Sequence, residues 1–121
     1  MSTDFRDKSA LRIPDGARLH VIVESASQHI QASGFLHREG TTTEEAWTHE
    51  MLFHAGVTRT LKAPNGYIAE VDVDFVGTAT ETATVTMTIE DQNGKQLRKW
   101  SEEFTHEKPW MGVMQYVISL P

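Results

Sequence analysis

The sequence predicts an all-β domain folded as an antiparallel two-sheet β-sandwich, immunoglobulin-like in the broad sense, with about eight strands. Apolar and polar residues alternate over several runs, most clearly in YIAEVDVDFV (67–76) and in the threonine-rich run that ends at Glu90. Turn residues such as Asn65-Gly66 and Asn93-Gly94 separate these runs at short intervals. Helical and strand patterns do not alternate along the chain, which disfavours a parallel α/β fold. A small β-barrel with an internal cavity is the second architecture that fits the pattern.

Length and composition indicate one globular domain. The chain has 121 residues, of which 39% are hydrophobic, and this is enough to bury a core without disulfides. We expect a charged N-terminal arm over residues 1–16 and a single sandwich domain over residues 17–121. No apolar run is long enough to cross a membrane, and the N-terminal segment lacks the apolar stretch of a secretory signal. We therefore expect a cytoplasmic protein without membrane insertion, with export or membership of a larger assembly as the alternative.

The charge balance disfavours nucleic acid as a partner. The chain carries 17 acidic and 11 basic residues, a net charge of −6. No Lys or Arg lies between Lys62 and Lys95, although that segment contains several Asp and Glu residues. Such a surface repels phosphate backbones and anionic lipid headgroups. The chain also has no Cys, which excludes disulfides, thiol nucleophiles and thiolate metal sites.

The first half of the chain predicts four strands. Residues 18–24 place Leu19, Val21 and Val23 on one face, and residues 29–39 form a second strand in which Gly34 marks a bulge or a close crossing. Residues 44–56 are ambiguous, because Thr43 could cap a helix. We favour a strand there, since its neighbours are strands and since Trp47, His49, Met51 and Phe53 would then share a face. Residues 57–62 form a short strand.

The stretch from Ala69 to Phe104 predicts three strands joined as an antiparallel meander. The first two strands keep the same parity of apolar residues, so an odd-numbered loop at residues 77–81 should join them. The next hairpin should close through a three-residue turn, Gln92 to Gly94, with Gly94 left-handed. Trp100 and Phe104 differ in parity from Leu97, which predicts a bulge near Arg98-Lys99. The last strand, 113–120, should be central and covered on both faces.

The sequence offers no catalytic residues. The six histidines are scattered, and His49 and His54 stand five residues apart rather than the four that a helical zinc motif requires. No nucleophile elbow or phosphate-binding loop is present. We therefore expect that the protein is not an enzyme and that it needs no cofactor.

One acidic row is the weak candidate for a metal site. Glu70, Asp72 and Asp74 lie on one face of a strand, where a flat ladder spreads their carboxylates instead of converging them. Calcium is the cation that such a row would take, and a solvated strand face is the simpler interpretation. The threonines at even positions from Thr78 to Thr88 are also typical of an exposed strand face.

Two tryptophans are the candidate contact residues for a ligand or partner, Trp110 and Trp47. Trp110 follows Pro109 in a predicted loop, where an exposed ring could bind a partner or stack on a sugar. The sequence thus favours a non-enzymatic interaction or assembly module that binds a protein partner or itself through open sheet edges. The alternative is a module that binds a saccharide or another small ligand, with or without a cation.

Overall fold

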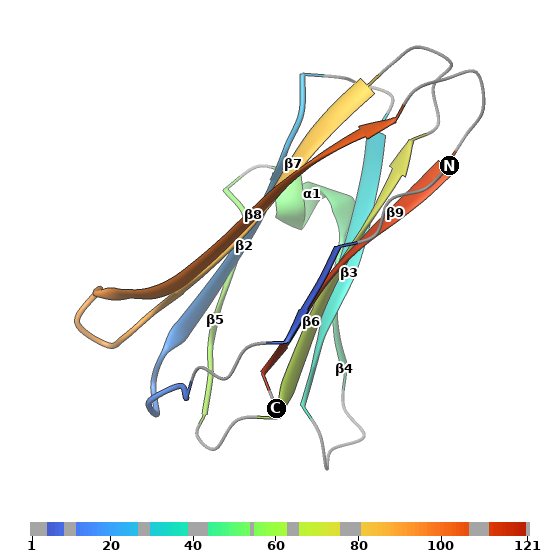
Figure 1. The fold of residues 1–121 in the computed structure, drawn as a ribbon. Coiled ribbons are helices and arrows are strands. Elements are labelled where there is room, and N and C mark those ends of the chain that lie inside the picture. Colours follow the sequence, from blue (N-terminus) through green and yellow to red (C-terminus); the bar gives the residue numbers. More distant parts are fainter. Residues whose placement is uncertain are drawn as a thin grey trace.

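The protein is a two-layer β-sandwich, as the sequence predicts. The computed structural model describes residues 5–8, 12–26, 30–38, 44–53, 55–62, 66–75, 81–106 and 112–120. Nine strands form a five-stranded and a four-stranded sheet that face each other (Figure 1). Within the described ranges no strand of one sheet pairs with a strand of the other, so the sheets do not close into the barrel that was the alternative. The finer assignment of the sandwich as immunoglobulin-like stays a prediction.

The five-stranded sheet has the order β1-β9-β6-β3-β4. Its strands are β1 (Phe5–Lys8), β3 (Ile30–Arg38), β4 (Glu44–Trp47), β6 (Tyr67–Phe75) and β9 (Gly112–Leu120). All neighbours are antiparallel except β1 and β9, which are parallel. Part of the segment expected to be an arm therefore forms an edge strand, and Ile13 beyond it lies in the core.

The four-stranded sheet has the order β5-β2-β7-β8, and all its neighbours are antiparallel. Its strands are β2 (Arg18–Glu24), β5 (Val57–Thr60), β7 (Glu81–Glu90) and β8 (Gln96–His106). β8 lies at one edge of this sheet, and the β7–β8 hairpin projects at one end of the molecule (Figure 1).

The core lies between the sheets and follows from the alternation of the sequence. Along β6 and β7 every second residue is buried without interruption, because only one face of each strand meets the other sheet. β6 contributes Val71, Val73 and Phe75, and β7 contributes Val85 and Met87, all fully buried. On β9 the outward-facing Val117 is also buried, at 7% exposure, which agrees with the central position predicted for this strand.

The predicted meander is wrong at its first connection. β6 pairs with β3 and β9, whereas β7 pairs with β2 and β8, so the two strands belong to different sheets. The unchanged parity of apolar residues that suggested an odd-numbered hairpin loop results instead from a crossover between the sheets. Of the loop predicted at residues 77–81, only Glu81 belongs to the described residues, and it begins β7.

The segment 44–56 is part strand and part helix. β4 covers residues 44–47, as predicted, but the continuous strand is wrong because α1 (His49–Phe53) follows. Thr48 rather than Thr43 caps this helix: the Met51 N–H donates to Thr48 Oγ1 at 3.4 Å. Burial of Leu52 holds α1 against β2 and β3. In the described part of the chain no helix is long and apolar enough to cross a membrane.

The β7–β8 hairpin confirms the predicted turn. Gly94 has a φ of +84°, and its N–H donates to the Asp91 carbonyl at 3.1 Å. The predicted bulge is real but begins one residue earlier. Ile89 pairs with Arg98 and Glu90 with Gln96, which leaves Leu97 as the extra residue. The register shift turns Trp100 and Phe104 into the core.

Gly34 is the close crossing that the sequence suggests. It lies in β3 between β4 and β6, where a Cβ atom would stand 2.3 Å from the Glu70 carbonyl oxygen and 3.1 Å from Cε3 of Trp47. Both neighbours are fixed, one by the sheet ladder and the other by burial in the core. The absent side chain therefore allows the Trp47 ring to lie over the middle of the sheet.

We expect Gly34→Ala to lower the free energy of unfolding by about 2 kcal/mol or more, because the backbone must shift to admit one methyl group. Urea denaturation monitored by tryptophan fluorescence measures the change. Ser33→Ala is the matched control on the exposed face of the same strand, and should stay within about 0.5 kcal/mol. Equal stabilities of the two variants would contradict the close approach.

Candidate functional site

The two predicted contact tryptophans are placed differently. Trp47 is 2% exposed and belongs to the hydrophobic core, packed over Gly34. Its indole Nε1 is buried and has no hydrogen-bond partner among the described residues. In this fold the Trp47 ring offers no open surface to a ligand. Trp110 lies outside the described residues, and its role as a contact residue stays a prediction.

The acidic row lies on the outer face of the five-stranded sheet, as predicted. Glu70, Asp72 and Asp74 alternate along β6 with buried residues. Glu70 stands opposite Val117 of β9, and Val117 stands opposite Arg6 of β1. The Arg6 guanidinium donates to Oε1 of Gln115 at 2.7 Å. The sheet thus brings one cation towards the row from an edge strand that is distant in sequence.

Partial burial and the neighbouring Asp72 carboxylate favour the protonated form of Glu70. The pKa of Glu70 is raised from 4.5 to about 7, first because partial burial disfavours the charged form. A side-chain hydrogen bond with Asp72 and repulsion from the Asp72 charge raise the pKa further, and Glu44 adds a smaller repulsion. Arg6 acts in the opposite direction. At neutral pH this part of the row is therefore less negative than its composition suggests.

A hollow of about 260 Å³ lies beside the pair, lined by Gln31, Ala32, Ser33, His49, Asp72 and Asp74. Oδ1 of Asp72 is buried and has no hydrogen-bond partner among the described residues. However, no group of three His, Cys, Asp or Glu side chains among the described residues is arranged to hold a metal ion. The weak calcium prediction for Glu70, Asp72 and Asp74 stays a prediction.

Two of the histidines bind backbone groups. Nε2 of His20 contacts the Ala55 carbonyl at 2.9 Å, and only a protonated nitrogen can donate to that oxygen. Nδ1 of His49 accepts from the Ala32 N–H at 3.1 Å, while its ring stacks on Phe53 at 4.4 Å. His49 thereby satisfies a backbone donor of β3 beyond the last residue that pairs with β4. These two side chains fix α1 and the strand that follows it to the sheets.

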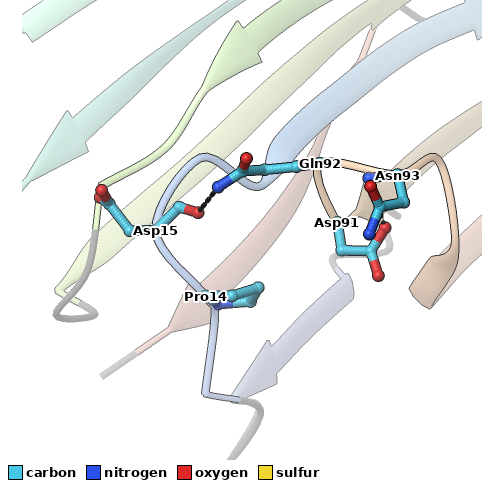
Figure 2. Close-up of a pocket in the computed structure, with 5 residues that line it drawn as sticks. All are labelled: Pro14, Asp15, Asp91, Gln92 and Asn93. Atoms are coloured by element: carbon cyan, nitrogen blue, oxygen red, sulfur yellow. Dashed lines mark hydrogen bonds between the residues drawn. The ribbon is translucent and has the colours of Figure 1, made fainter.

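A second hollow lies where the turn before β2 meets the β7–β8 hairpin. It encloses about 370 Å³ and is lined by Pro14, Asp15, Asp91, Gln92 and Asn93. Figure 2 shows the Gln92 amide donating to the Asp15 backbone carbonyl, 2.8 Å away, with the Asp15 carboxylate turned away from Asp91. Oδ1 of Asp91 accepts the backbone N–H groups of Asn93 and Lys95, each at 2.9 Å. The polar groups here close the hairpin and do not converge on a common point.

The sheet edges differ strongly in length. β1, β4 and β5 contain four residues each, whereas β8 contains eleven. β8 pairs with β7 along one side, and no strand in the described part of the chain pairs with its other side. Backbone N–H and C=O groups along such an edge can bind another strand.

Side-chain pairs connect the edge strands of the two sheets. On one side the Nε1–H of Trp100 in β8 donates to Oδ2 of Asp7 in β1 at 2.6 Å, and Arg98 lies 3.6 Å from the same oxygen. On the other side Arg59 of β5 pairs with Glu45 of β4. The alternation of apolar and polar residues indicated the strands and the bulge before Trp100. It could not indicate these side-chain pairs, because they join strands that are distant in sequence.

No protein-family model matches the chain, and neither a curated protein nor a solved structure is significantly similar to it.

The raised pKa of Glu70 predicts a pH dependence of stability. The folded protein binds this proton more tightly than the unfolded chain, so the free energy of unfolding falls as pH rises from 4.5 to about 7. Glu70→Gln removes the charge, and we expect it to stabilise the protein by about 0.5 to 1 kcal/mol at pH 8, since solvent screens a partly exposed pair. At pH 4 the two proteins should be nearly equal.

Urea midpoints at pH 4, 5.5 and 8 test this expectation. Asp74→Asn is the matched control, because it removes one negative charge from the same strand face and leaves the contact between Glu70 and Asp72 intact. A stability difference for Glu70→Gln that is the same at all three pH values would contradict the raised pKa of Glu70.

Proposed function

We propose that this protein is a non-enzymatic interaction module that binds an extended strand of a protein partner along the open edge of β8. The length of this edge is the observation that carries the proposal. Among the described strands, the eleven-residue β8 is paired on one side only, and beyond the bulge at Leu97 its free side offers alternate backbone donors and acceptors. Strand addition to a sheet edge is a recurring mode of peptide recognition in which main-chain hydrogen bonds supply the affinity.

The surface around the edge supports this proposal. The outer face of β8 carries Lys99, Ser101, Glu103 and Thr105, all of which are exposed. The neighbouring face of β7 carries only threonines from Thr82 to Thr88, and these are half-buried. The hydroxyl groups of Thr82 and Thr105 lie 3.1 Å apart, and those of Thr86 and Ser101 lie 3.2 Å apart. These contacts hold the edge strand β8 against β7. A partner strand would meet an ordered backbone.

The described polar clusters favour binding over catalysis. His20 and His49 are hydrogen-bonded to backbone groups. The Glu70–Asp72 pair lies on a sheet face, and among the residues that line the hollow beside it only Ser33 carries a hydroxyl group that could act as a nucleophile. A general base needs a reacting group within hydrogen-bonding distance and a partner that orients the base. The hydrogen bonds of these histidines hold the fold together instead.

The alternative of a saccharide-binding module has less support in the described part of the chain. Stacking on sugar needs an exposed aromatic face. Trp47 and Trp100 are 2% and 4% exposed, and Tyr67 is 8% exposed with Arg38 over its ring. That alternative now depends on Trp110 and stays a prediction, as does the cytoplasmic location.

We expect an extended peptide of alternating Thr and Val to slow hydrogen exchange at alternate β8 amides between Gln96 and His106. The alternation is diagnostic because successive residues of an edge strand direct their N–H groups to opposite sides. Exchange measured by NMR on the labelled protein at low concentration, with and without excess peptide, reports each amide separately.

The control peptide has the same composition with Pro at every third position, which removes the donors that a ladder requires. Protection confined to other strands, or no protection at a concentration where the peptide is soluble and extended, would rule out β8 as the binding edge.

A further inference from the structure

We propose that the partner strand at this edge is β8 of a second copy of the same chain, related by a two-fold axis that passes between the two Ser101 residues. This inference rests on the proposed function and specifies its partner. The reason is the order of charges along the strand. Arg98 and Lys99 precede Trp100 and Ser101, and Glu102 and Glu103 follow them. An antiparallel copy reverses this order and sets the basic half of one strand beside the acidic half of the other.

The faces of the strand define the register. Residues directly opposite in an antiparallel pair point to the same side of the sheet. With Ser101 opposite Ser101, Lys99 stands opposite Glu103 of the second copy on the outer face, and the reciprocal pair forms by symmetry. Lys99 and Glu103 are both exposed in the single chain. On the inner face Arg98 then lies diagonally across from Glu102 of the second copy, within reach of long side chains.

The same charges disfavour other pairings. A parallel copy in register would set Arg98 and Lys99 beside their own counterparts, and Glu102 and Glu103 likewise, so that like charges oppose each other. The bulge at Leu97 ends the regular part of the edge next to the hairpin. Charged and bulged edge strands resist indiscriminate pairing. Here the charge order favours the antiparallel pairing over the parallel one, and such discrimination between pairings makes an interface specific.

The assembly that results is a continuous sheet. Joining two β8 strands extends the order β5-β2-β7-β8 through the axis to the β5 of the second copy. The inner side of each β8 remains tied to its own β1, because Trp100 and Arg98 contact Asp7. The dimer thus keeps these contacts and uses an edge with which no described strand pairs.

Charge reversal tests this inference by sedimentation equilibrium on the full chain. K99E places Glu opposite Glu103, and E103K places Lys opposite Lys99, so each variant alone should dimerise on the order of ten-fold more weakly than the native chain. Mixed in equal amounts, the two variants should form a heterodimer at least as readily as the native homodimer, because both cross-strand pairs are then opposite in charge. The K99E/E103K double variant should recover self-association for the same reason.

Lys62→Glu is the control, since it changes the net charge as K99E does at an exposed residue away from β8. It should leave association nearly unchanged. A native chain that stays monomeric at millimolar concentration overturns the inference, as do reversals that fail to complement each other. Should the Thr/Val peptide nevertheless protect alternate β8 amides, strand addition at this edge stands and only the identity of the partner is wrong.

Discussion

The burial of one face of every long strand is the constraint on which this structure depends. Along β6 and β7 each odd-numbered residue enters the core, and the even-numbered residues face outward. Burying this apolar area is the main favourable term in folding, and the two inner faces supply almost all of it. The sandwich therefore buries the apolar faces of its strands. What remains to be satisfied is the hydrogen bonding at the edges of the two sheets.

The four edge strands differ in length and in their side-chain contacts. Three edge strands are short, and side-chain pairs connect the edges of the two sheets: Asp7 with Trp100 on one side, Glu45 with Arg59 on the other. His49 satisfies a free backbone donor of β3 beyond the end of β4. β8 is the exception, because its contacts with Asp7 involve side chains and leave its outer backbone edge unpaired by any described strand. The proposals concern this edge because it is the longest of the four.

Alternation in the sequence predicted most of the strands, their faces and the β7–β8 hairpin, because these follow from periodicity and turn chemistry within a few residues, but β1 lies in the segment expected to be an arm. It could not predict which strands pair. Two strands that face the core from opposite sheets show the same parity as two strands joined by an odd-numbered loop, so β6 and β7 were assigned to one meander. The helix α1 was missed for a related reason. One turn of helix at residues 49–53 is too short to show a helical period, and the sequence suggested Thr43 as its cap, whereas Thr48, three residues before Met51, has that role.

The candidate sites were less predictable than the fold. The acidic row was visible in the sequence, but the raised pKa of Glu70 depends first on partial burial and then on the Asp72 side chain, and Arg6 from a distant strand opposes it. Trp47 was selected as a contact residue because aromatic rings often bind ligands, and its burial results from Gly34 in a neighbouring strand. The charge order of β8 was present in the sequence throughout. It gained meaning only when the topology placed that strand at a long open edge.

Disulfide trapping tests the central claim most directly, because the chain contains no Cys and an introduced thiol has no competitor. Ser101→Cys places the two sulfur atoms opposite each other across the proposed axis, where cross-strand Cβ atoms lie roughly 4.5–5.5 Å apart. Under mild oxidation, non-reducing electrophoresis should show a covalent dimer for Ser101→Cys and none for Thr58→Cys on the exposed face of β5. Equal trapping of both variants, or failure of Ser101→Cys to cross-link at concentrations where the native chain associates, would contradict the pairing of β8 with β8.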